Sequence, residues 1–233
     1  MEGPDSPVYA LHKNPSMIDY PGHLSGVFMV SGCNFRCRFC HNPELMRRRQ
    51  KGIPWERLES MCEELKDNWV DAAAVFGGEP TTAKDLEALL KLFKRLGWRV
   101  KVDTNGSNPE RLAACLPYMD YVAMDVKASE AGYPALTGYA DTDRVRASIA
   151  LVRERAADYE FRTTVIESFH TDEEMHAVGA LVRGARRYVL QAFVPQEDLP
   201  DPALAREPRT SDERLAALRV LMQGCADEVT VRG

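Results

Sequence analysis

Short apolar runs alternate along this chain with longer stretches of helical periodicity, and this alternation limits the fold more than any other feature. The apolar runs are the predicted strands, at residues 26–30, 72–76, 99–103, 121–125, 160–166, 188–193 and 228–231. Strands separated by helices of ten or more residues pair in parallel through right-handed crossovers. The sequence therefore predicts an α/β fold with a mostly parallel sheet, either an open (βα)6 partial barrel or a doubly wound sheet.

Length and composition fit one soluble domain. The chain has 233 residues, of which 45% are hydrophobic and 28% charged, which is ordinary globular composition. We expect residues 1–14 to be a poorly ordered lead-in and 15–233 to form a single domain, with an irregular Pro-rich loop at 195–208. No apolar stretch reaches 18 residues and the N-terminus lacks a signal core, so we expect no membrane span and a cytoplasmic protein.

The charge balance argues against nucleic acid as the main partner. The net charge is −5, and phosphate binding needs clustered Lys and Arg. The one basic run, at residues 47–51, is expected to be a solvated loop.

Three of the six cysteines, Cys33, Cys37 and Cys40, lie within eight residues. In a reducing cytoplasm, such cysteines are better explained as metal ligands or buried thiols than as disulfides. A closed iron–sulfur cluster takes four cysteines and no fourth lies nearby, so one iron would keep an open position. A structural zinc site that adds His41 is the competing interpretation. The other cysteines, expected to be core thiols, are Cys62, Cys115 and Cys225.

Polar signatures follow three of the predicted strands. They are Gly77, Gly78 and Glu79, then Asp103, Thr104 and Asn105, then Asp125 and Lys127. Glycine allows a ligand to approach the backbone closely, and Glu79 could accept hydrogen bonds from an ammonium group. Each signature alone also fits a turn or a helix cap. Because ligands of parallel α/β folds bind where the strands end, we expect these residues to form one polar site.

The cysteine spacing, with Phe39 directly before Cys40, resembles that of the radical S-adenosylmethionine (SAM) superfamily. This resemblance implies that the three cysteines hold a 4Fe–4S cluster whose fourth iron is chelated by the amino and carboxylate groups of SAM. It places Phe39 where the family has an aromatic residue whose neighbouring backbone meets the adenine. It also places Gly77-Gly78-Glu79-Pro80 where the family binds the SAM amino group.

The later strand ends are similar to motifs of the pyruvate formate-lyase activating enzyme that bind SAM and a monovalent cation. Asn105 lies in one of these motifs. By this resemblance the cation ligands would be Asp103, Thr104 and Asp125. Lys127 would meet the SAM carboxylate, and Arg162 matches an arginine that binds SAM, with a surface salt bridge as its alternative. Gln191 falls where such enzymes place further active-site contacts.

Several segments narrow the resemblance to the anaerobic ribonucleoside-triphosphate reductase activating proteins in their longer form. They are residues 18–22, 33–45, 102–109, 121–127, 136–138 and 188–191. The implied reaction cleaves SAM reductively to methionine and a 5′-deoxyadenosyl radical, which removes a hydrogen atom from a glycine α-carbon of a partner enzyme. The expected partners are a glycyl-radical enzyme, first of all an anaerobic ribonucleotide reductase, and an electron donor such as flavodoxin or ferredoxin. A short chain without a second cysteine cluster fits such an activase.

Three alternatives remain open at this point. The first is a radical SAM enzyme that acts on a small molecule, of the 7-carboxy-7-deazaguanine synthase type. The second is an activase of a different glycyl-radical enzyme. The third is a non-catalytic zinc-binding interaction module, which metal analysis of an anaerobic preparation would distinguish.

Overall fold

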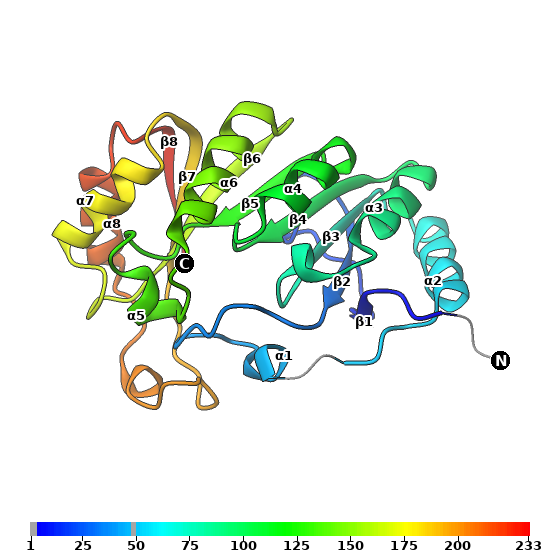
Figure 1. The fold of residues 1–233 in the computed structure, drawn as a ribbon, viewed down its shortest axis with the longest axis horizontal. Helices are drawn as coiled ribbons and strands as arrows, with labels where there is room; N and C mark the ends of the chain where they lie inside the picture. The colour runs from blue at the N-terminus through cyan, green and yellow to red at the C-terminus, as the bar shows by residue number, and fades with distance from the viewer. Residues whose placement is uncertain (1–3, 48–49) are drawn as a thin grey trace.

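The computed structural model describes residues 4–47 and 50–233 and contains one eight-stranded sheet (Figure 1). Its strands lie side by side in chain order: β1 Val8–Leu11, β2 Ser25–Val30, β3 Ala72–Gly77, β4 Arg99–Thr104, β5 Tyr121–Asp125, β6 Tyr159–Val165, β7 Ala185–Ala192 and β8 Ala226–Arg232. Strands β2 to β8 are parallel, and β1 pairs antiparallel with β2. The predicted α/β class and parallel sheet are confirmed.

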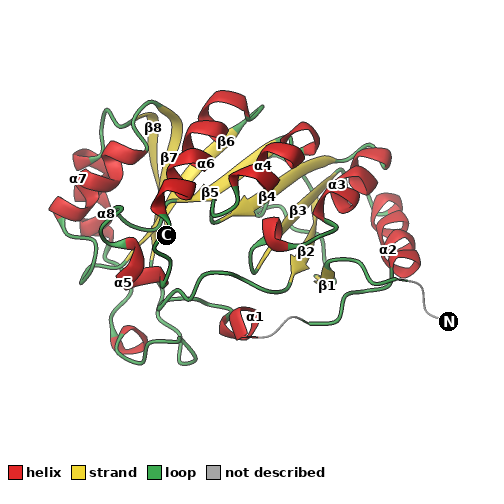
Figure 2. Cartoon of the chain, in the orientation of Figure 1, coloured by secondary structure: helices red, strands yellow, loops and turns green. Residues whose placement is uncertain are grey.

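The strand order decides between the two predicted arrangements. In a doubly wound sheet the order reverses near the middle, whereas each strand here pairs only with its neighbours in the chain. The six crossovers that join the seven parallel strands therefore wind in one direction, as in a partial barrel. Figure 2 shows the consequence, because the longer helices between the strands lie on one face, and mainly loops with short helices lie under the other.

The helices of the described chain are α1 Pro43–Arg47, α2 Trp55–Asp67, α3 Leu86–Arg95, α4 Pro109–Cys115, α5 Tyr133–Thr137, α6 Thr142–Arg155, α7 Asp172–Leu181 and α8 Asp212–Leu221. Three short 3-10 turns lie at Pro80–Thr82, Leu116–Tyr118 and Leu204–Arg206. Local chemistry sets several of the starts. The Asn108 side chain accepts a hydrogen bond from the Arg111 amide and Pro109 occupies the first helical position, which together begin α4 directly after a strand end.

The hydrophobic core lies between the helices and the outer face of the sheet. Helix α3 buries Leu86, Leu89, Leu90 and Phe93 at the three- and four-residue spacing expected from the sequence. The Phe93 ring packs 4.5 Å from that of Phe28 on β2. This packing leaves the inner face of the sheet free to carry polar side chains.

The N-terminal segment corrects one expectation. Residues 1–14 are not a lead-in throughout, because Val8–Leu11 forms β1, with Val8 fully buried beside Val30. An edge strand that precedes the first helical stretch breaks the strand–helix alternation, which explains why the pattern missed it. The short helices α1 and α5 were also not predicted. Residues 1–3 lie outside the described residues.

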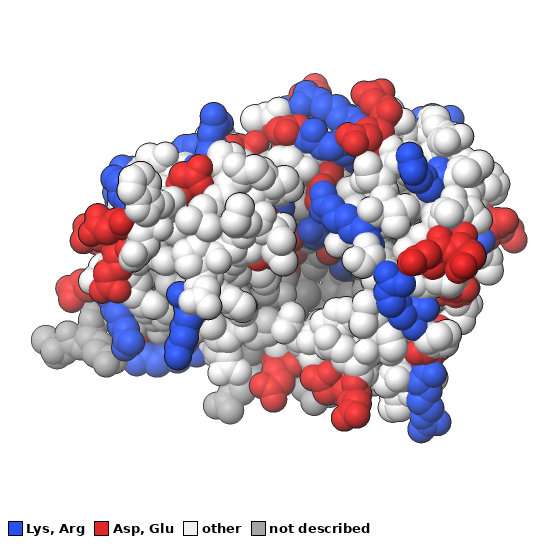
Figure 3. Space-filling model, turned by 180° about the vertical axis from the view of Figure 1, so that it is seen from behind, with Lys and Arg blue, Asp and Glu red and all other residues white. Residues whose placement is uncertain are grey.

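On the face shown in Figure 3, basic and acidic side chains of the described residues lie interspersed. Over the same described ranges, no helix is long and apolar enough to cross a membrane. Of the basic run at 47–51, residues 48 and 49 lie outside the described part of the chain.

Candidate functional site

A cavity of about 530 Å³ opens at the carboxyl ends of β2 to β7. Every site residue predicted from the sequence lines it: Cys33, Cys37, Phe39, Cys40, Gly77, Gly78, Glu79, Asp103, Thr104, Asn105, Asp125, Lys127, Arg162 and Gln191. The sequence analysis missed other lining residues, among them Asp19, Phe35, Phe76 and Thr164. Thr164 follows Arg162 by two residues on β6, so strand alternation could have identified it.

The cysteine loop, residues 31–42, forms one wall of this cavity. Its side chains alternate as in an extended strand. From Cys33 to Phe39 the odd-numbered residues line the cavity, whereas Asn34, Arg36 and Arg38 are exposed, and Cys40, His41 and Asn42 line the cavity too. All three cysteines of the loop therefore lie in the cavity wall.

The chemistry of the three thiols fits a shared inorganic centre. Burial raises the pKa of Cys37 to about 12 and also raises the pKa of Cys33 and Cys40. Cys33 and Cys40 raise the Cys37 pKa further, so the three groups are close neighbours, and Lys127 opposes these effects. Metal binding removes thiol protons, so three converging thiols beside a cation are suited to hold a cluster as thiolates.

The structure gives less support to the zinc alternative. His41 directs Nε2 toward the carbonyl oxygen of Val194, 2.9 Å away. Within residues 4–47 and 50–233, no three His, Cys, Asp or Glu side chains, the three loop cysteines included, are grouped so that they could hold one metal ion. A 4Fe–4S cluster does not require the thiols to meet at one ion, because each cysteine binds a different iron. The three predicted core thiols, Cys62, Cys115 and Cys225, are buried outside the cavity.

The glycines that end β3 lie in close contact with the backbone of neighbouring segments. Gly77 has φ of +125°, and a Cβ placed on it would lie 2.4 Å from the carbonyl oxygen of Val30. A Cβ on Gly78 would lie 2.1 Å from the carbonyl oxygen of Gly32, next to the first cysteine. The Gly78 amide donates to Val30 O and the Glu79 amide to Gly32 O. The close approach of β2 at Val30 therefore requires Gly77, and that of the cysteine loop requires Gly78, a reason that the sequence analysis did not foresee.

Glu79 is almost completely buried and organises two strand ends. Its Oε1 accepts hydrogen bonds from the hydroxyls of Thr81 and Thr104 and from the Thr81 amide, and Oε2 accepts from the Asn105 amide at 2.6 Å. Burial raises the pKa of Glu79, and these donors oppose the rise. With one acceptor position on Oε2 still available, its predicted contact with an ammonium group stays a prediction.

The inner face of the sheet carries a chain of five alternating charges. Lys101 pairs with Asp103, whose Oδ2 lies 2.8 Å from Nη1 of Arg162. Nε of Arg162 reaches Oδ1 of Asp125 at 2.9 Å, and Oδ2 of Asp125 reaches Nζ of Lys127 at 3.0 Å. Of these five groups Lys101 does not line the cavity, so the part of the chain that faces it carries two cations and two carboxylates. Lys127 and Arg162 are the cations of the lining that could meet an anionic group of a ligand, such as a carboxylate.

The predicted ligands of the monovalent cation take part in this chain of charges or contact Glu79. Arg162 bridges the carboxylates of Asp103 and Asp125, and the hydroxyl of Thr104 donates to Glu79 at 2.7 Å. The three predicted ligands thus have partners within the protein, and a monovalent cation there stays a prediction. Lys101 was missed, although it alternates with Asp103 on β4 and so shares its face.

The protonation states follow from these contacts. Burial would raise the pKa of Asp125, but Arg162 and Lys127 outweigh it and lower that pKa to about 2. For Asp103, burial is likewise outweighed by Arg162 and Lys101, which lower the pKa. Burial would lower the pKa of Lys127, but the Asp125 carboxylate raises it. Asp103, Asp125 and Lys127 are therefore ionised at neutral pH.

Two predicted residues touch the cysteine loop directly. The side-chain nitrogen Nδ2 of Asn105 donates to Oδ1 of Asn34 at 3.1 Å and makes a longer contact, 3.8 Å, with Sγ of Cys33. The Phe39 ring lies 5.6 Å from Nζ of Lys127, a cation–π distance. Asn105 and Lys127 thereby connect the ends of β4 and β5 to the wall that carries the sulfur atoms.

A second cavity, of about 560 Å³, lies at the amino ends of the strands. Its arginines are paired within the chain, as Arg99 with Asp120, Arg187 with Asp158 and Arg232 with Glu160. These pairs satisfy its charges internally. We therefore place the functional site in the first cavity.

Comparison with known proteins agrees with this placement. The sequence profile of the radical SAM superfamily matches residues 27–181. A Methanocaldococcus jannaschii protein named as a glycyl-radical enzyme activating enzyme is 29% identical over 225 residues, which cover 93% of this chain and 92% of that protein. The 7-carboxy-7-deazaguanine synthase of Methanopyrus kandleri is 25% identical over 181 residues, covering 65% of this chain and 70% of that enzyme.

The fold is also similar to that of a solved structure. The crystal structure of Streptococcus suis SuiB bound to S-adenosylmethionine has a TM-score of 0.67 and 17% identity. The alignment covers 91% of this chain and 51% of that one, so this chain spans about half of SuiB. Because the superfamily profile spans the cysteine loop and strands β2 to β6, which build most of the cavity, this chain belongs to the radical SAM superfamily, whose enzymes use a 4Fe–4S cluster and S-adenosylmethionine.

Proposed function

We propose that this protein is an activase that generates a glycyl radical on a partner enzyme. One observation carries the proposal: the similarity to the glycyl-radical enzyme activating enzyme of M. jannaschii extends over nearly the full length of both chains. It includes the cysteine loop, all the strand ends around the cavity and the segment at 195–208. The similarity to the 7-carboxy-7-deazaguanine synthase covers a smaller part of this chain.

The residues of the cavity have separate tasks in this proposal. Cys33, Cys37 and Cys40 hold the cluster by their thiolates and leave one iron open toward the cavity. Lys127 and Arg162 bind the SAM carboxylate, since both are cations that line the cavity. When bound, the cluster and SAM supply the 5′-deoxyadenosyl radical that removes a hydrogen atom from the glycine.

The backbone and the aromatic wall orient SAM in the same proposal. The carbonyl groups at Gly77 and Gly78, with the free acceptor position of Glu79, receive the amino group, and Phe39 borders the adenine. The buried hydrogen bonds of Glu79 hold the ends of β3 and β4 together, which fixes these acceptors before SAM arrives. A fixed, enclosed site restricts a reactive radical to its target.

We further propose an anaerobic ribonucleotide reductase as the partner. The segments that resemble activating proteins of that reductase support this choice, and we expect the loops at residues 47–51 and 195–208 to be the docking surfaces. Two residues of the first surface, 48 and 49, lie outside the described chain. A peptide loop that carries the glycine would enter where the strands end.

The test uses the anaerobically reconstituted protein, SAM, dithionite and the candidate reductase. We expect a doublet glycyl signal in the electron paramagnetic resonance spectrum of the reductase, together with 5′-deoxyadenosine. Cys37→Ala should abolish both products, and a reductase whose radical glycine is replaced by alanine should lose the signal.

A small-molecule enzyme is the second candidate, favoured by the similarity to 7-carboxy-7-deazaguanine synthase. Cleavage of SAM without a glycyl signal, but with consumption of that enzyme's small-molecule substrate, would replace the activase proposal with this one. Absence of any SAM cleavage would contradict both.

A further inference from the structure

We propose that Tyr133 and His170 are positioning residues for SAM binding, because they hold the main chain of Lys127 from its two sides. The inference rests on the proposed function in one respect, namely that Lys127 binds the SAM carboxylate. Both side chains are fully buried, and neither lines the cavity. An effect of either residue on SAM therefore has to pass through another residue.

The main chain of Lys127 lies beyond the end of its strand. Strand β5 ends at Asp125, and the last backbone hydrogen bond toward β6 runs from the Val126 amide to the Arg162 carbonyl oxygen at 2.8 Å. A residue beyond that point has no neighbouring strand to pair with its own amide and carbonyl groups. Backbone groups inside a fold need partners, so other parts of the chain have to supply them.

Two side chains supply these partners. The Lys127 amide donates to the hydroxyl oxygen of Tyr133 at 3.1 Å, and Nε2 of His170 lies 3.0 Å from the Lys127 carbonyl oxygen. Burial lowers the pKa of His170, so its ring is neutral. Nδ1 of this ring accepts from the Ile166 amide at 2.9 Å, which leaves the ring hydrogen on Nε2. His170 therefore donates to Lys127, while Tyr133 accepts from it.

Both partners are themselves fixed by elements outside the cavity. Tyr133 begins α5, and the turn before it is held by Glu174 of α7, whose carboxylate accepts from the Ser129 amide at 2.6 Å and from the Ser129 hydroxyl at 2.8 Å. His170 follows β6, and its carbonyl oxygen accepts from Nη2 of Arg214 on α8 at 2.7 Å. The position of the Lys127 main chain is thus set by three helices.

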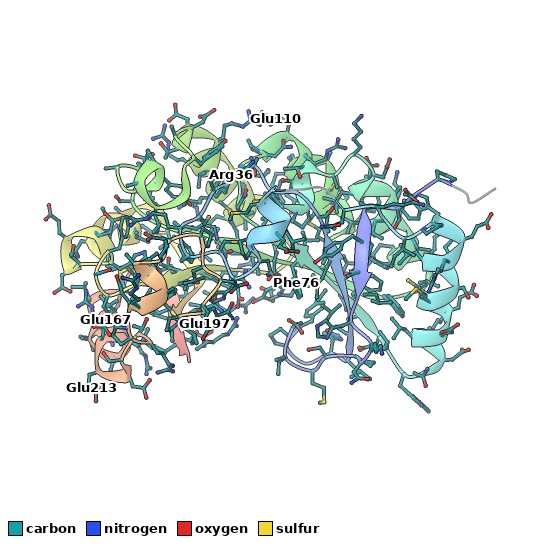
Figure 4. All side chains as sticks on the ribbon, turned by 90° about the horizontal axis from the view of Figure 1, so that it is seen from below. Arg36, Phe76, Glu110, Glu167, Glu197 and Glu213 are labelled. Carbon is teal, nitrogen blue, oxygen red and sulfur yellow. The ribbon has the colours of Figure 1, made fainter. Side chains whose placement is uncertain are left out.

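Helix α5 also holds the cysteine loop. The amide of Arg36, the loop residue labelled in Figure 4, donates to the Thr137 carbonyl oxygen at 2.7 Å. The Tyr133 ring meets the Phe35 ring edge to face, with 6.2 Å between their centroids. One short helix therefore contacts both the loop that carries the cysteines and the main chain of Lys127, and it sets the two relative to each other.

A fixed main chain restricts where the ammonium group of Lys127 can lie. Its Nζ lies 3.0 Å from Oδ2 of Asp125 and 5.6 Å from the centre of the Phe39 ring. A lysine side chain has a flexible stem, so these contacts at its tip do not fix its base. Hydrogen bonds to the amide and the carbonyl group fix the base, which reduces the ordering that SAM binding has to impose.

The test compares two buried tyrosines that make the same kind of hydrogen bond. Tyr133→Phe removes the hydroxyl that accepts from the Lys127 amide. Tyr159→Phe is the matched control, because it removes a hydroxyl that accepts from the Arg186 amide, also at 3.1 Å, from a tyrosine that does not line the cavity. Calorimetry measures the SAM Kd of the anaerobically reconstituted proteins, and urea unfolding of the reduced apo-proteins measures their stability.

We expect Tyr133→Phe to raise the SAM Kd about fivefold, the size of effect that one neutral hydrogen bond produces. Tyr159→Phe should leave the Kd unchanged, although both variants should lower the urea midpoint, since each leaves one amide without its acceptor. In assays of 5′-deoxyadenosine formation with dithionite, Tyr133→Phe should raise the KM for SAM and retain the rate at saturating SAM.

A double variant shows whether the effect passes through Lys127. In the Lys127→Ala background, Tyr133→Phe should not change the SAM Kd further, because the side chain that it positions is absent. His170→Gln is the conservative variant on the other side. A glutamine amide can donate to the Lys127 carbonyl and accept from the Ile166 amide, so His170→Gln should retain more SAM affinity than His170→Phe.

An unchanged SAM Kd in Tyr133→Phe would overturn the inference. So would an equal rise in Tyr159→Phe, which is the effect of a general loss of stability, or a rise that persists in the Lys127→Ala background. Should Tyr133→Phe lose its iron, equal SAM affinities of His170→Gln and His170→Phe would overturn the inference instead. Wild-type affinity in Lys127→Ala would contradict both the inference and the role of Lys127, whereas the glycyl signal still decides the activase proposal.

Discussion

Removal of the Arg162 guanidinium should destabilise the fold in a pH-dependent way. Arg162 joins the partly buried carboxylates of Asp103 and Asp125, so Arg162→Leu leaves two negative charges facing each other. The pKa of Asp125 is lowered from 3.8 to about 2. At about 1.4 kcal/mol for each pKa unit, its charged partners stabilise the folded state by about 2 kcal/mol at neutral pH.

Breaking a buried pair from one side costs about 3–5 kcal/mol. Lys101 and Lys127 still neutralise part of the negative charge, so we expect Arg162→Leu to lower the free energy of unfolding by about 2–3 kcal/mol. Arg162→Lys keeps the charge but loses the guanidinium fork that reaches both carboxylates, so its free energy of unfolding should lie between those of Arg162→Leu and the wild type.

The pH dependence gives a sharper check. A carboxyl group whose folded pKa is lowered contributes stability that is present above its unfolded pKa and is lost as the pH falls toward its folded pKa. The difference between wild type and Arg162→Leu should therefore be full at neutral pH and shrink below about pH 4, as Asp125 is protonated first in the variant.

Urea unfolding of the reduced apo-protein, followed by circular dichroism at several pH values, measures both effects. A difference below about 0.5 kcal/mol at neutral pH would show that the chain of charges is merely a surface feature. A difference that stays constant down to about pH 3 would show that Asp125 does not depend on Arg162.

Four further predictions concern the cavity. Replacing any cysteine of the loop by alanine should abolish iron and sulfide binding, whereas Cys62→Ala should leave both unchanged in anaerobic metal analysis, because Cys62 is buried elsewhere. Gly78→Val should prevent cluster assembly as well as SAM binding, since its side chain would meet the loop backbone; a normal iron content would contradict this. Lys127→Ala should weaken SAM binding by about 1.5–3 kcal/mol in calorimetry while iron content is retained. His170→Phe should weaken SAM binding less than Lys127→Ala does and should lower the urea midpoint of unfolding, because His170 Nε2 lies 3.0 Å from the Lys127 carbonyl oxygen. Unchanged SAM affinity would show that His170 does not position Lys127.

Much of the site could be predicted because parallel strands end at one edge. Asp103, Asp125 and Arg162 are far apart in the sequence, yet each lies at or near the carboxyl end of a strand, and strand alternation puts all three on the inner face. Once the strands were identified, their proximity followed from geometry. The cysteine loop needed no such step, because its three thiols are neighbours in the sequence.

The remainder depended on contacts between distant segments. The requirement for Gly78 arises from the carbonyl of Gly32, and the sequence does not reveal which backbone passes there. Similarly, Glu79 keeps only one acceptor position for a ligand, because Thr81, Thr104 and Asn105 occupy the others. Strand β1 was missed because pairing with β2, rather than its own pattern, stabilises it.

The sequential strand order has a consequence for how the nascent chain matures. Each strand pairs only with strands next to it in the chain, so the sheet can grow as the ribosome releases it. The three cysteines emerge early, whereas the groups that fasten their loop, Thr137 and Asp201, are synthesised about 100 and 160 residues later. Before then the loop has only its contacts with earlier residues, such as Glu79 and Asn105, so its backbone contacts at Arg36 and Arg38 are complete only once residue 201 has been made.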